Sequence, residues 1–487
     1  MSAMLIWIAV AGFALLGGVI AVLAARENTG TAADYYLGNR HLGGIVAGLS
    51  YAATTYSAFM LVVLTGLTYR GGVGALGFEL IYFSGLTLLV VFGPRFWLAA
   101  RRWGFVTPAE MLSARYGDRN IARLVALISL VFLMPYCTTQ MAGIGLLLSG
   151  ATGGEISLGM AIGVGAALAI FWTLLAGLRS VAWTDAVQAI VMLGSALLAV
   201  GFVVSAIGGW GAFAAKLTES HASWLDLPGP GLWSLPTFLA LSLPWFFFAL
   251  SNPQVSQRLF VTRDLAAMRR MIFWVLGFGL IFTLISVTWG FAALVLTPDL
   301  ENPAGATPAL LGSGAVPVVV GLLLIIGILS AAVSTLDSIA LTLGSMVARD
   351  LVRVDRDSSQ ILIGRVIVVL VVLFAAYFAL QSAQIVSQLA ALSAAGLLVT
   401  VPATIGAFFW HRGTAAGVLA SLIGGAGTAI YMALIAGISV FDPRLAASVM
   451  TVTLGLFVAV SLLTKPRATA LDFKTDLKSD LRAFGVW

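Results

Sequence analysis

Long apolar stretches dominate the chain and alternate with short polar connections. A run of about 20 apolar residues is long enough to cross a bilayer as a helix. The pattern predicts thirteen such spans, at residues 4–25, 44–70, 75–100, 121–149, 155–178, 182–208, 235–257, 270–297, 314–347, 360–380, 384–410, 413–437 and 445–464. We therefore expect an all-α polytopic membrane protein with thirteen transmembrane helices.

Composition agrees with this fold class. Of 487 residues, 60% are hydrophobic and 9% charged, whereas soluble domains carry about 25% charged residues. Cys137 is the one cysteine, so no intramolecular disulfide is expected. Three scattered histidines argue against a histidine-based metal or catalytic centre, and no stretch resembles a nucleotide loop or a nucleophilic triad. We expect neither an enzyme nor an organic cofactor.

The net charge of +6 could indicate a nucleic-acid partner, but the positions of the basic residues indicate membrane topology. With the N-terminus outside, all but three of the 26 Lys and Arg residues fall on the inner side of the predicted spans, the exceptions being Arg70, Lys216 and Arg444. Basic residues gather in cytoplasmic loops. We therefore expect a multi-pass protein of the plasma membrane, with its N-terminus outside and its C-terminus inside. The lipid bilayer is an expected partner of the protein, and nucleic acid is not.

Two spans are interrupted by polar residues or proline. Thr54, Thr55 and Ser57 lie in the second span, and Pro244 and Asn252 lie in the seventh, five spans later. This spacing is typical of transporters built from two inverted five-helix repeats whose first helices are broken at the substrate site. The alternative is ordinary Ser, Thr and Pro within unbroken membrane helices.

The repeat interpretation divides the chain into six parts. These are a leading helix (1–30), a first repeat (44–208), an extracellular loop (209–234), a second repeat (235–410), two peripheral helices (411–465) and a cytoplasmic tail (466–487). The loop is either a cap over an entrance or a plain connector. The tail is too short for a soluble signalling domain, which favours a transporter over a sensor.

Three carboxylates, Glu79, Asp185 and Asp337, lie within the predicted spans, where no Lys or Arg is expected at mid-depth. Cations or protons are then the natural counter-charges. Asp185 could instead reach the interface or pair with Arg179, Asp337 could be a hydrogen-bonded or protonated structural group, and Glu79 could bond another helix. Around Asp337, the hydroxyls of Ser330–Ser338 offer the oxygen ligands that hard cations prefer, unless they bond back to the preceding turn.

Four stretches, Asp34–Arg40, Thr107–Gly117, Gly177–Asp185 and Ser330–Ser338, together resemble the sodium:solute symporter family. The family includes proline, pantothenate, sialic acid, sugar and iodide carriers, and the similarity runs from about residue 34 to about 464. The resemblance implies thirteen helices, an outside N-terminus and a ten-helix inverted-repeat core similar to that of the bacterial leucine transporter.

The same resemblance implies two ion sites. The main sodium site would use the carbonyls of Ala53, Tyr56 and Ala331 and the hydroxyls of Ser334 and Thr335. A second site, found in some members, would use Ser334 with Asp185, Asp337 and Ser338. Members with this site often have a small residue where Asp337 stands. Two carboxylates in one pocket would bind sodium or share a proton.

The substrate site implied by the resemblance lies between the broken helices and is lined by Thr55, Tyr56, Ser57, Met60, Glu79, Gln140, Trp245 and Phe248. Proline carriers have Asp where Thr55 stands, and sialic acid carriers have an Arg that is absent here. Sugar carriers have a Glu at the position of Glu79. The negative charge of this residue disfavours a simple carboxylate as substrate.

The resulting hypothesis is a sodium-coupled symporter that imports a small polar organic solute by alternating access, with sodium as coupling ion. The alternatives are a carrier coupled to sodium and protons, a transporter-like membrane sensor and a channel. No obligate protein partner is evident, and the sequence does not identify the solute.

Overall fold

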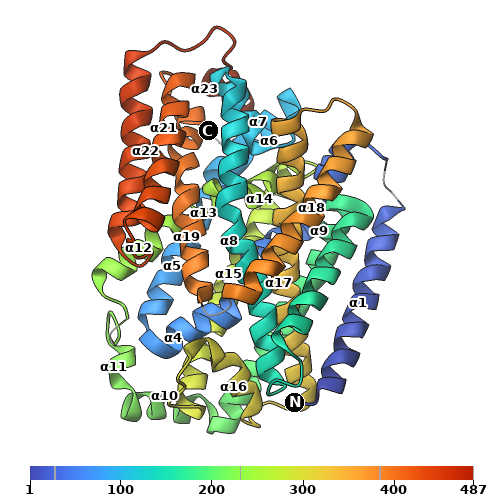
Figure 1. Ribbon diagram of the computed structural model, residues 1–487, viewed down its shortest axis with the longest axis vertical. Coiled ribbons are helices and arrows are strands. Elements are labelled where there is room, and N and C mark those ends of the chain that lie inside the picture. Colours follow the sequence, from blue (N-terminus) through green and yellow to red (C-terminus); the bar gives the residue numbers. More distant parts are fainter. Residues whose placement is uncertain (27–28, 231, 383–384, 486–487) are drawn as a thin grey trace.

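The computed structural model describes residues 1–26, 29–230, 232–382 and 385–485, which form a bundle of helices (Figure 1). Within these ranges there is no strand, only an isolated bridge between Leu42 and Thr262. Eleven helices of the described chain are long and apolar enough to cross a membrane, or twelve when one bent pair is counted as a span. The expected all-α class is confirmed.

The first half of the chain contains α1 (Ala3–Ala25), α2 (Ala32–Leu37), η1 (Gly38–Arg40), α3 (Gly44–Thr55), η2 (Phe59–Leu64), α4 (Thr65–Gly71), α5 (Gly74–Leu86), α6 (Leu88–Trp103), α7 (Pro108–Tyr116), α8 (Arg119–Ala151), α9 (Leu158–Ile207), α10 (Gly209–Ser220) and α11 (Ala222–Leu225). The element η2 is a π-helix, and η1 is a 3-10 helix.

The second half contains α12 (Leu235–Phe246), α13 (Phe248–Ser251), α14 (Pro253–Ser256), η3 (Gln257–Phe260), α15 (Leu265–Leu296), η4 (Pro303–Gly305), α16 (Ala306–Gly312), α17 (Val318–Met346), η5 (Val347–Val352), α18 (Asp357–Ser382), α19 (Val386–Leu397), η7 (Leu398–Thr400), α20 (Val401–Phe409), α21 (Ala415–Ile430), η8 (Tyr431–Ile435), α22 (Pro443–Leu463), α23 (Phe473–Asp476) and α24 (Lys478–Ala483).

The count of thirteen spans is not reproduced, because the predicted span 235–257 is broken into short pieces. Pro244 lies inside α12, and Asn252 has an extended backbone (φ −96°, ψ 110°) between α13 and α14. Proline removes a helical donor, and an extended residue interrupts the helical ladder. Pro244 and Asn252 correctly predicted an interruption here, but the prediction still counted residues 235–257 as one complete span.

α17 forms the centre of the bundle. Every residue from Leu324 to Ala348 is buried, and α17 packs against α9, α8, α3 and α18. By contrast, α1 lies at one edge of the bundle, and α21 and α22 pack together at another (Figure 1). A membrane helix buried on all sides can hold polar residues, because other helices shield them from lipid.

Two of the stretches that carry the family resemblance meet at a bend in α9. Gly177 has φ of +60°, and a Cβ there would lie 2.2 Å from the carbonyl oxygen of Tyr35 in α2, so only glycine fits. Beside this contact, Arg179 forms an ion pair with Asp34 at 3.0 Å. The alternative in which Arg179 pairs with Asp185 is therefore wrong.

The predicted loop 209–234 packs on the end of α4 and the start of α5. The indole nitrogen of Trp224 donates to the carbonyl of Tyr69 at 2.8 Å, and the Trp224 carbonyl accepts from the amide of Val73 at 2.8 Å. Trp233 is buried and stacks on Phe78 with ring centroids 5.9 Å apart. These contacts anchor the loop over the helices that lead to the predicted substrate site, while its role as a cap stays a prediction.

Candidate functional site

The break in the second span lies where the hydroxyl residues predicted it. α3 ends at Thr55, Tyr56 leaves the helical conformation (φ −94°, ψ 81°), and the chain resumes at Phe59 with a bend of 47°. The Ser57 hydroxyl accepts from the amide of Phe59 at 3.2 Å. The Ser57 side chain thus replaces one of the helical hydrogen bonds lost at the break. The last carbonyls of α3 have no helical N–H partner and are free to bind other groups.

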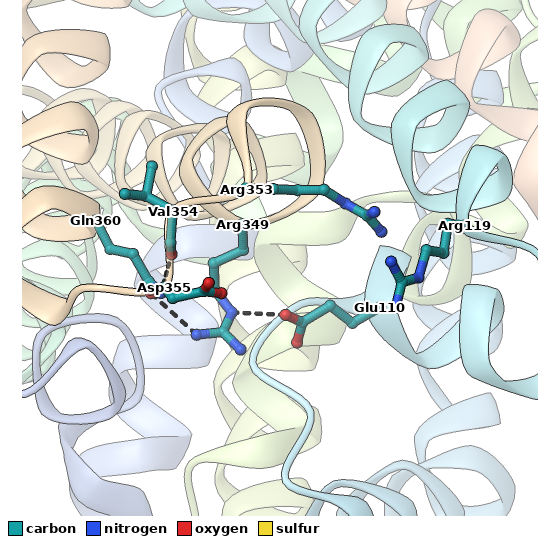
Figure 2. A pocket seen from close by; sticks show the side chains of 7 residues that line it. All are labelled: Glu110, Arg119, Arg349, Arg353, Val354, Asp355 and Gln360. Carbon is teal, nitrogen blue, oxygen red and sulfur yellow. Dashed lines mark hydrogen bonds and ion pairs between the residues drawn. The ribbon is translucent and has the colours of Figure 1, made fainter.

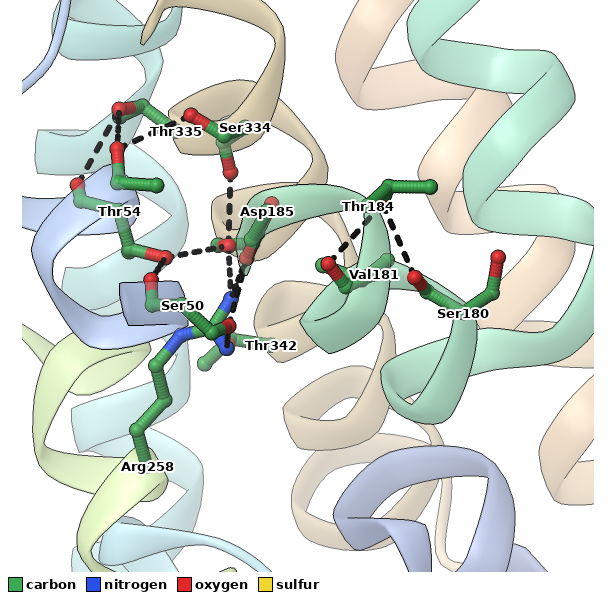
Figure 3. A network of polar contacts seen from close by, with 12 residues as sticks. Ser50, Thr54, Ser180, Val181, Thr184, Asp185, Arg258, Ser334, Thr335 and Thr342 are labelled. Carbon is green, nitrogen blue, oxygen red and sulfur yellow. Dashed lines mark hydrogen bonds and ion pairs between the residues drawn. The ribbon is translucent and has the colours of Figure 1, made fainter. Parts of the chain in front are cut away.

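Hydroxyls of α17 point at these carbonyls. Ser334 Oγ donates to the Ala53 carbonyl at 3.0 Å and lies 3.2 Å from the Ala331 carbonyl. Thr335 Oγ1 lies 3.4 Å from the Ala53 carbonyl and 3.2 Å from that of Thr54. Four of the five predicted ligands of the main sodium site therefore lie together, and Figure 3 shows Ser334 and Thr335 beside Thr54.

The chemistry of these oxygens suits a monovalent cation. Each is a neutral carbonyl or hydroxyl, and hard cations take such oxygen ligands. Among the described residues there is no group of three or more His, Cys, Asp or Glu side chains that could hold a metal ion. Because these oxygens are neutral, they suit a monovalent cation such as sodium better than a divalent metal.

Tyr56, the fifth predicted ligand, is held by aromatic packing. Its ring lies 5.9 Å from that of Tyr82 and 5.8 Å from that of Phe278. On α15, Gly279 leaves room for the phenol, because a Cβ there would lie 2.0 Å from the Tyr56 hydroxyl oxygen. The residue that follows the end of α3 is thereby fixed between two helices.

The second predicted ion pocket contains a residue that was not expected there. Arg258, in η3, is buried and lies 2.9 Å from the carboxylate of Asp185 (Figure 3). Its guanidinium also donates to the hydroxyls of Ser50 and Ser338, and Ser50 donates to Asp185 at 2.8 Å. The expectation that no Lys or Arg lies at depth beside the three carboxylates is wrong for Asp185.

The reason for this error is the path of the chain after Asn252. The apolar pattern ends there, which suggested that Arg258 belongs to a loop. Instead α14 and η3 continue into the protein, and Gln254, Gln257 and Arg258 are all buried. Ser50 and Thr54 were also missed, although they stand four residues apart on α3, a spacing that places both on one face.

Asp337 differs from its neighbours in this pocket. Ser338 bonds to Thr54 at 2.8 Å and to the Ser334 carbonyl at 2.7 Å, whereas neither carboxylate oxygen of Asp337 has a hydrogen-bond partner in the described structure. Asp185 and Arg258 lie close enough to act on it electrostatically. The nearby Thr173 hydroxyl donates to the Ala169 carbonyl of its own helix at 2.8 Å. Arg258 forms an ion pair with Asp185. In the described structure, no such ion pair is made by the carboxylate of Asp337.

The predicted substrate residues form an aromatic cluster around the break in α3. Trp245 and Phe248 stack with centroids 5.4 Å apart, and Tyr82 meets both edge-on at 5.3 and 5.4 Å. Tyr136, which the sequence analysis did not include, bonds Ser57 at 3.1 Å. Thr55, Tyr56, Ser57, Met60, Glu79, Gln140, Trp245 and Phe248 are all buried.

Within the described residues, Glu79 makes no hydrogen bond to another helix, which contradicts that alternative. Both of its carboxylate oxygens are buried without a partner in the described structure, as is Oε1 of Gln140. Glu79 and Tyr82 stand three residues apart on α5, which places them on the same side of the helix. Tyr82 contacts Trp245 and Phe248 of the aromatic cluster.

A charged cluster closes the end of the bundle that carries α7 and the C-terminus. Arg349 donates to Glu110 at 2.6 Å and to Gln360 at 3.0 Å (Figure 2). Thr107 forms a capping box with Glu110 and donates to Asp350 at 2.8 Å. These bonds join α7 to η5 and α18 beside a cavity of about 430 Å³.

Comparisons with known proteins indicate the family of this chain. A family model described as the sodium:solute symporter family matches residues 35–425. The uncharacterized symporter YodF of Bacillus subtilis (strain 168) is 23% identical over 289 residues, which cover 58% of each chain. The sodium/pantothenate symporter of Escherichia coli (strain K12) is 34% identical over 203 residues, or 41% of each chain. The matched part thus spans about half the length of these curated relatives.

Solved structures share the fold along nearly the whole chain. A Na+-coupled sialic acid symporter in a substrate-bound outward-open state superposes with a TM-score of 0.78 at 19% identity, covering 95% of this chain and 98% of that one. Mhp1, a nucleobase-cation-symport-1 family transporter, gives 0.58 at 17% identity, with coverage of 91% and 98%. MhsT in complex with L-phenylalanine gives 0.51 at 14% identity, with coverage of 88% and 98%.

Proposed function

Because this chain belongs to the sodium:solute symporter family, we propose that it is a sodium-coupled symporter that imports a small polar organic solute by alternating access. The observation that carries the proposal is the contact between the hydroxyls of Ser334 and Thr335 and the Ala53 carbonyl at the break in α3. Sodium is the coupling ion, and we propose no organic cofactor, no covalent catalysis, no nucleic-acid partner and no obligate protein partner.

In this mechanism sodium binds between α3 and α17 and stabilises one arrangement of the two helices. Ser334 and Thr335 then turn their oxygens from hydrogen bonding toward the ion, together with the carbonyls of Ala53, Tyr56 and Ala331. An ion that binds one conformation better than another shifts the population toward it. A membrane potential of 100 mV adds about 2.3 kcal/mol for each charge moved, which favours accumulation of the solute.

The proposed topology follows the basic residues. We place the N-terminus outside and the C-terminus inside the plasma membrane, which puts the Glu110–Arg349 ion pair at the cytoplasmic end. Residues 44–208 and 235–410 form the two five-helix repeats, flanked by the leading helix, the extracellular loop, the two peripheral helices and the tail. Rocking of one repeat against the other would open each end in turn.

Asp337 is the proposed centre of a second cation site. Its two partnerless carboxylate oxygens support this role, whereas Asp185 and Ser338 are already bound to Arg258. Sodium and a proton are the two candidate occupants. If Asp337 binds a second sodium, Asp337→Asn makes the sodium dependence of uptake less steep. An unchanged steepness, with unchanged pH dependence, returns Asp337 to a structural role.

The direct test is solute uptake into proteoliposomes. A thermal-shift screen of amino acids, organic acids, amines, polyols and sugars, each with sodium or potassium, first identifies a solute that stabilises the protein. Uptake of that solute should exceed equilibration only under an inward sodium gradient. Uptake that ignores the gradient would favour a channel, and binding without any uptake would favour a transporter-like sensor.

A further inference from the structure

The hydrogen-bonding groups of the proposed substrate site are unevenly satisfied. Two of its donors are engaged, because the hydroxyl of Tyr82 donates to the Thr55 carbonyl at 3.3 Å and the amide nitrogen of Gln140 reaches the Tyr136 carbonyl at 3.5 Å. The hydroxyls of Thr55 and Tyr56, which can donate or accept, have no partner in the described structure. Its acceptors are free, since Glu79 Oε1 and Oε2 and Gln140 Oε1 are buried without partners. Because an ionised carboxylate oxygen and an amide oxygen can only accept, a ligand that satisfies these three oxygens must supply donors.

The charge at the site leads to a narrower requirement. Glu79 is fully buried, and in the described part of the chain no Lys or Arg donates a hydrogen bond to its carboxylate. A charged acid at bilayer depth costs at least about 2.5–3.5 kcal/mol unless an opposite charge compensates. Hydroxyl donors of a polyol would satisfy the acceptors but would leave this charge uncompensated, whereas an ammonium group would satisfy both.

The surrounding rings complete the argument. Trp245 and Phe248 lie parallel with an interplanar angle of 3°, Tyr82 and Tyr136 stand edge-on to Trp245 at 83° and 76°, and Phe59 packs on Trp245 at 5.0 Å. The faces of aromatic rings attract cations, most strongly when water is excluded. A carboxylate among buried rings is a site for an organic cation.

We propose that the imported solute carries an ammonium group with N–H donors, bound by the Glu79 carboxylate and Gln140 Oε1 within this aromatic cluster. The proposal rests on the proposed symport function and specifies the chemical class of its solute. A zwitterion such as an amino acid belongs to the class when its ammonium group enters the cluster, and neutral sugars and simple carboxylates do not.

The test uses compounds that share a six-membered ring and differ in charge and in hydrogen-bond donors. The purified full-length protein in detergent is titrated with piperidine, N,N-dimethylpiperidinium, cyclohexanol, tetrahydropyran or cyclohexanecarboxylate, and its melting temperature is recorded in sodium and in potassium buffer. We expect piperidine to stabilise the protein at concentrations at least about tenfold below those of the neutral and anionic rings, a difference of about 1.4 kcal/mol. N,N-dimethylpiperidinium, which lacks N–H donors, should fall between.

Variants of Glu79 assign the effect to its carboxylate. Glu79→Gln should abolish the preference for piperidine, and Glu79→Asp, which keeps the charge, should retain part of it. Glu219→Gln makes the same change at an exposed position on α10 and should match the wild type. If Glu79→Gln does not fold, the Glu79→Asp variant and the wild-type series still decide the matter.

Three results would overturn the proposal: equal or stronger stabilisation by a neutral or anionic ring, a preference for piperidine that persists in Glu79→Gln, or no stabilisation by any ring while sodium still stabilises. Symport is judged separately by the sodium response. If piperidine binds through Glu79 but sodium neither raises the melting temperature nor drives piperidine uptake into proteoliposomes, the symport proposal fails and the assigned substrate class stands.

Discussion

The guanidinium of Arg258 lies 2.9 Å from the carboxylate of Asp185, and both side chains are buried at the centre of the bundle. The pair links η3 to α9, and through Ser50 and Ser338 it also reaches α3 and α17. In the proposed rocking motion, α3 and α9 of the first repeat would move relative to η3 and α17 of the second. The pair and its hydroxyl partners therefore stabilise the conformation described here.

Breaking this ion pair on one side should destabilise the protein strongly. Arg258→Gln leaves Asp185 buried without its cation, and the loss of one partner of a buried pair costs about 3–5 kcal/mol. The melting temperature of the purified protein measures the effect. Arg263→Gln serves as control, because Arg263 and its partner Asp264 are exposed and such pairs contribute at most about 1 kcal/mol.

A double-mutant cycle separates pairing from local packing. If the pair is the cause, Asp185→Asn combined with Arg258→Gln should destabilise the protein less than the sum of the single variants, because neither charge then remains uncompensated. Strictly additive effects would show that the two residues act independently.

Removal of a hydroxyl ligand should weaken sodium binding. Ser334→Ala and Thr335→Ala should each raise the sodium concentration for half-maximal stabilisation about tenfold or more, since contacts to a charged group contribute about 1.5–3 kcal/mol. Thr288→Ala removes a hydroxyl that bonds only its own helix at Leu284 and should leave the value unchanged. Wild-type sodium dependence in both α17 variants would rule out the proposed site.

Two glycines of α15 offer a matched steric test of the Tyr56 position. A methyl group at Gly279 would lie 2.0 Å from the Tyr56 hydroxyl oxygen, whereas one at Gly277 meets nothing within 4 Å. Gly279→Ala should displace Tyr56 and weaken sodium binding at least several-fold, because overpacking a buried contact costs about 1–3 kcal/mol. Gly277→Ala should behave like the wild type in the same thermal-shift titration, and equal behaviour of both variants would contradict the prediction.

The Glu110–Arg349 pair should control access from the end of the bundle that carries α7. Pro108 of α7, two residues before Glu110, and Ser129 of α8 line a small cavity between helices. Glu110→Gln removes one partner of a partly buried pair that contributes about 1 kcal/mol. A loss of about 1 kcal/mol raises the population of the open form about fivefold, so the cavity that contains Ser129 should be accessible about five times more often. The rate at which a thiol reagent labels Ser129→Cys measures the opening.

The labelling experiment has a low background, because Cys137 is the one cysteine of the chain and is buried. Glu219→Gln in the Ser129→Cys background controls for the loss of a carboxylate elsewhere. Unchanged labelling in Glu110→Gln would show that other contacts close this end.

The residues by themselves determined the all-α membrane class, an interruption among the hydroxyls around Thr54 and Thr55, and another near Pro244 and Asn252. These features follow from local rules, because a bilayer requires long apolar helices and penalises polar groups and broken backbone unless they face protein. The group of Ser334 and Thr335 with Ala53 was predicted from the family resemblance instead. Local rules of this kind do not predict the number of complete spans or the partners of the buried charged residues.

Only the tertiary structure decided that Arg258 pairs with Asp185, that Arg179 pairs with Asp34, and that Glu79 has no partner. Each outcome depends on which residues, far apart in the chain, share one buried volume. The apolar pattern marks where a helix can cross the bilayer, but it does not record where short helices such as η3 turn back into the bundle. The charge balance at the two proposed binding sites therefore became visible only when the helices were packed together.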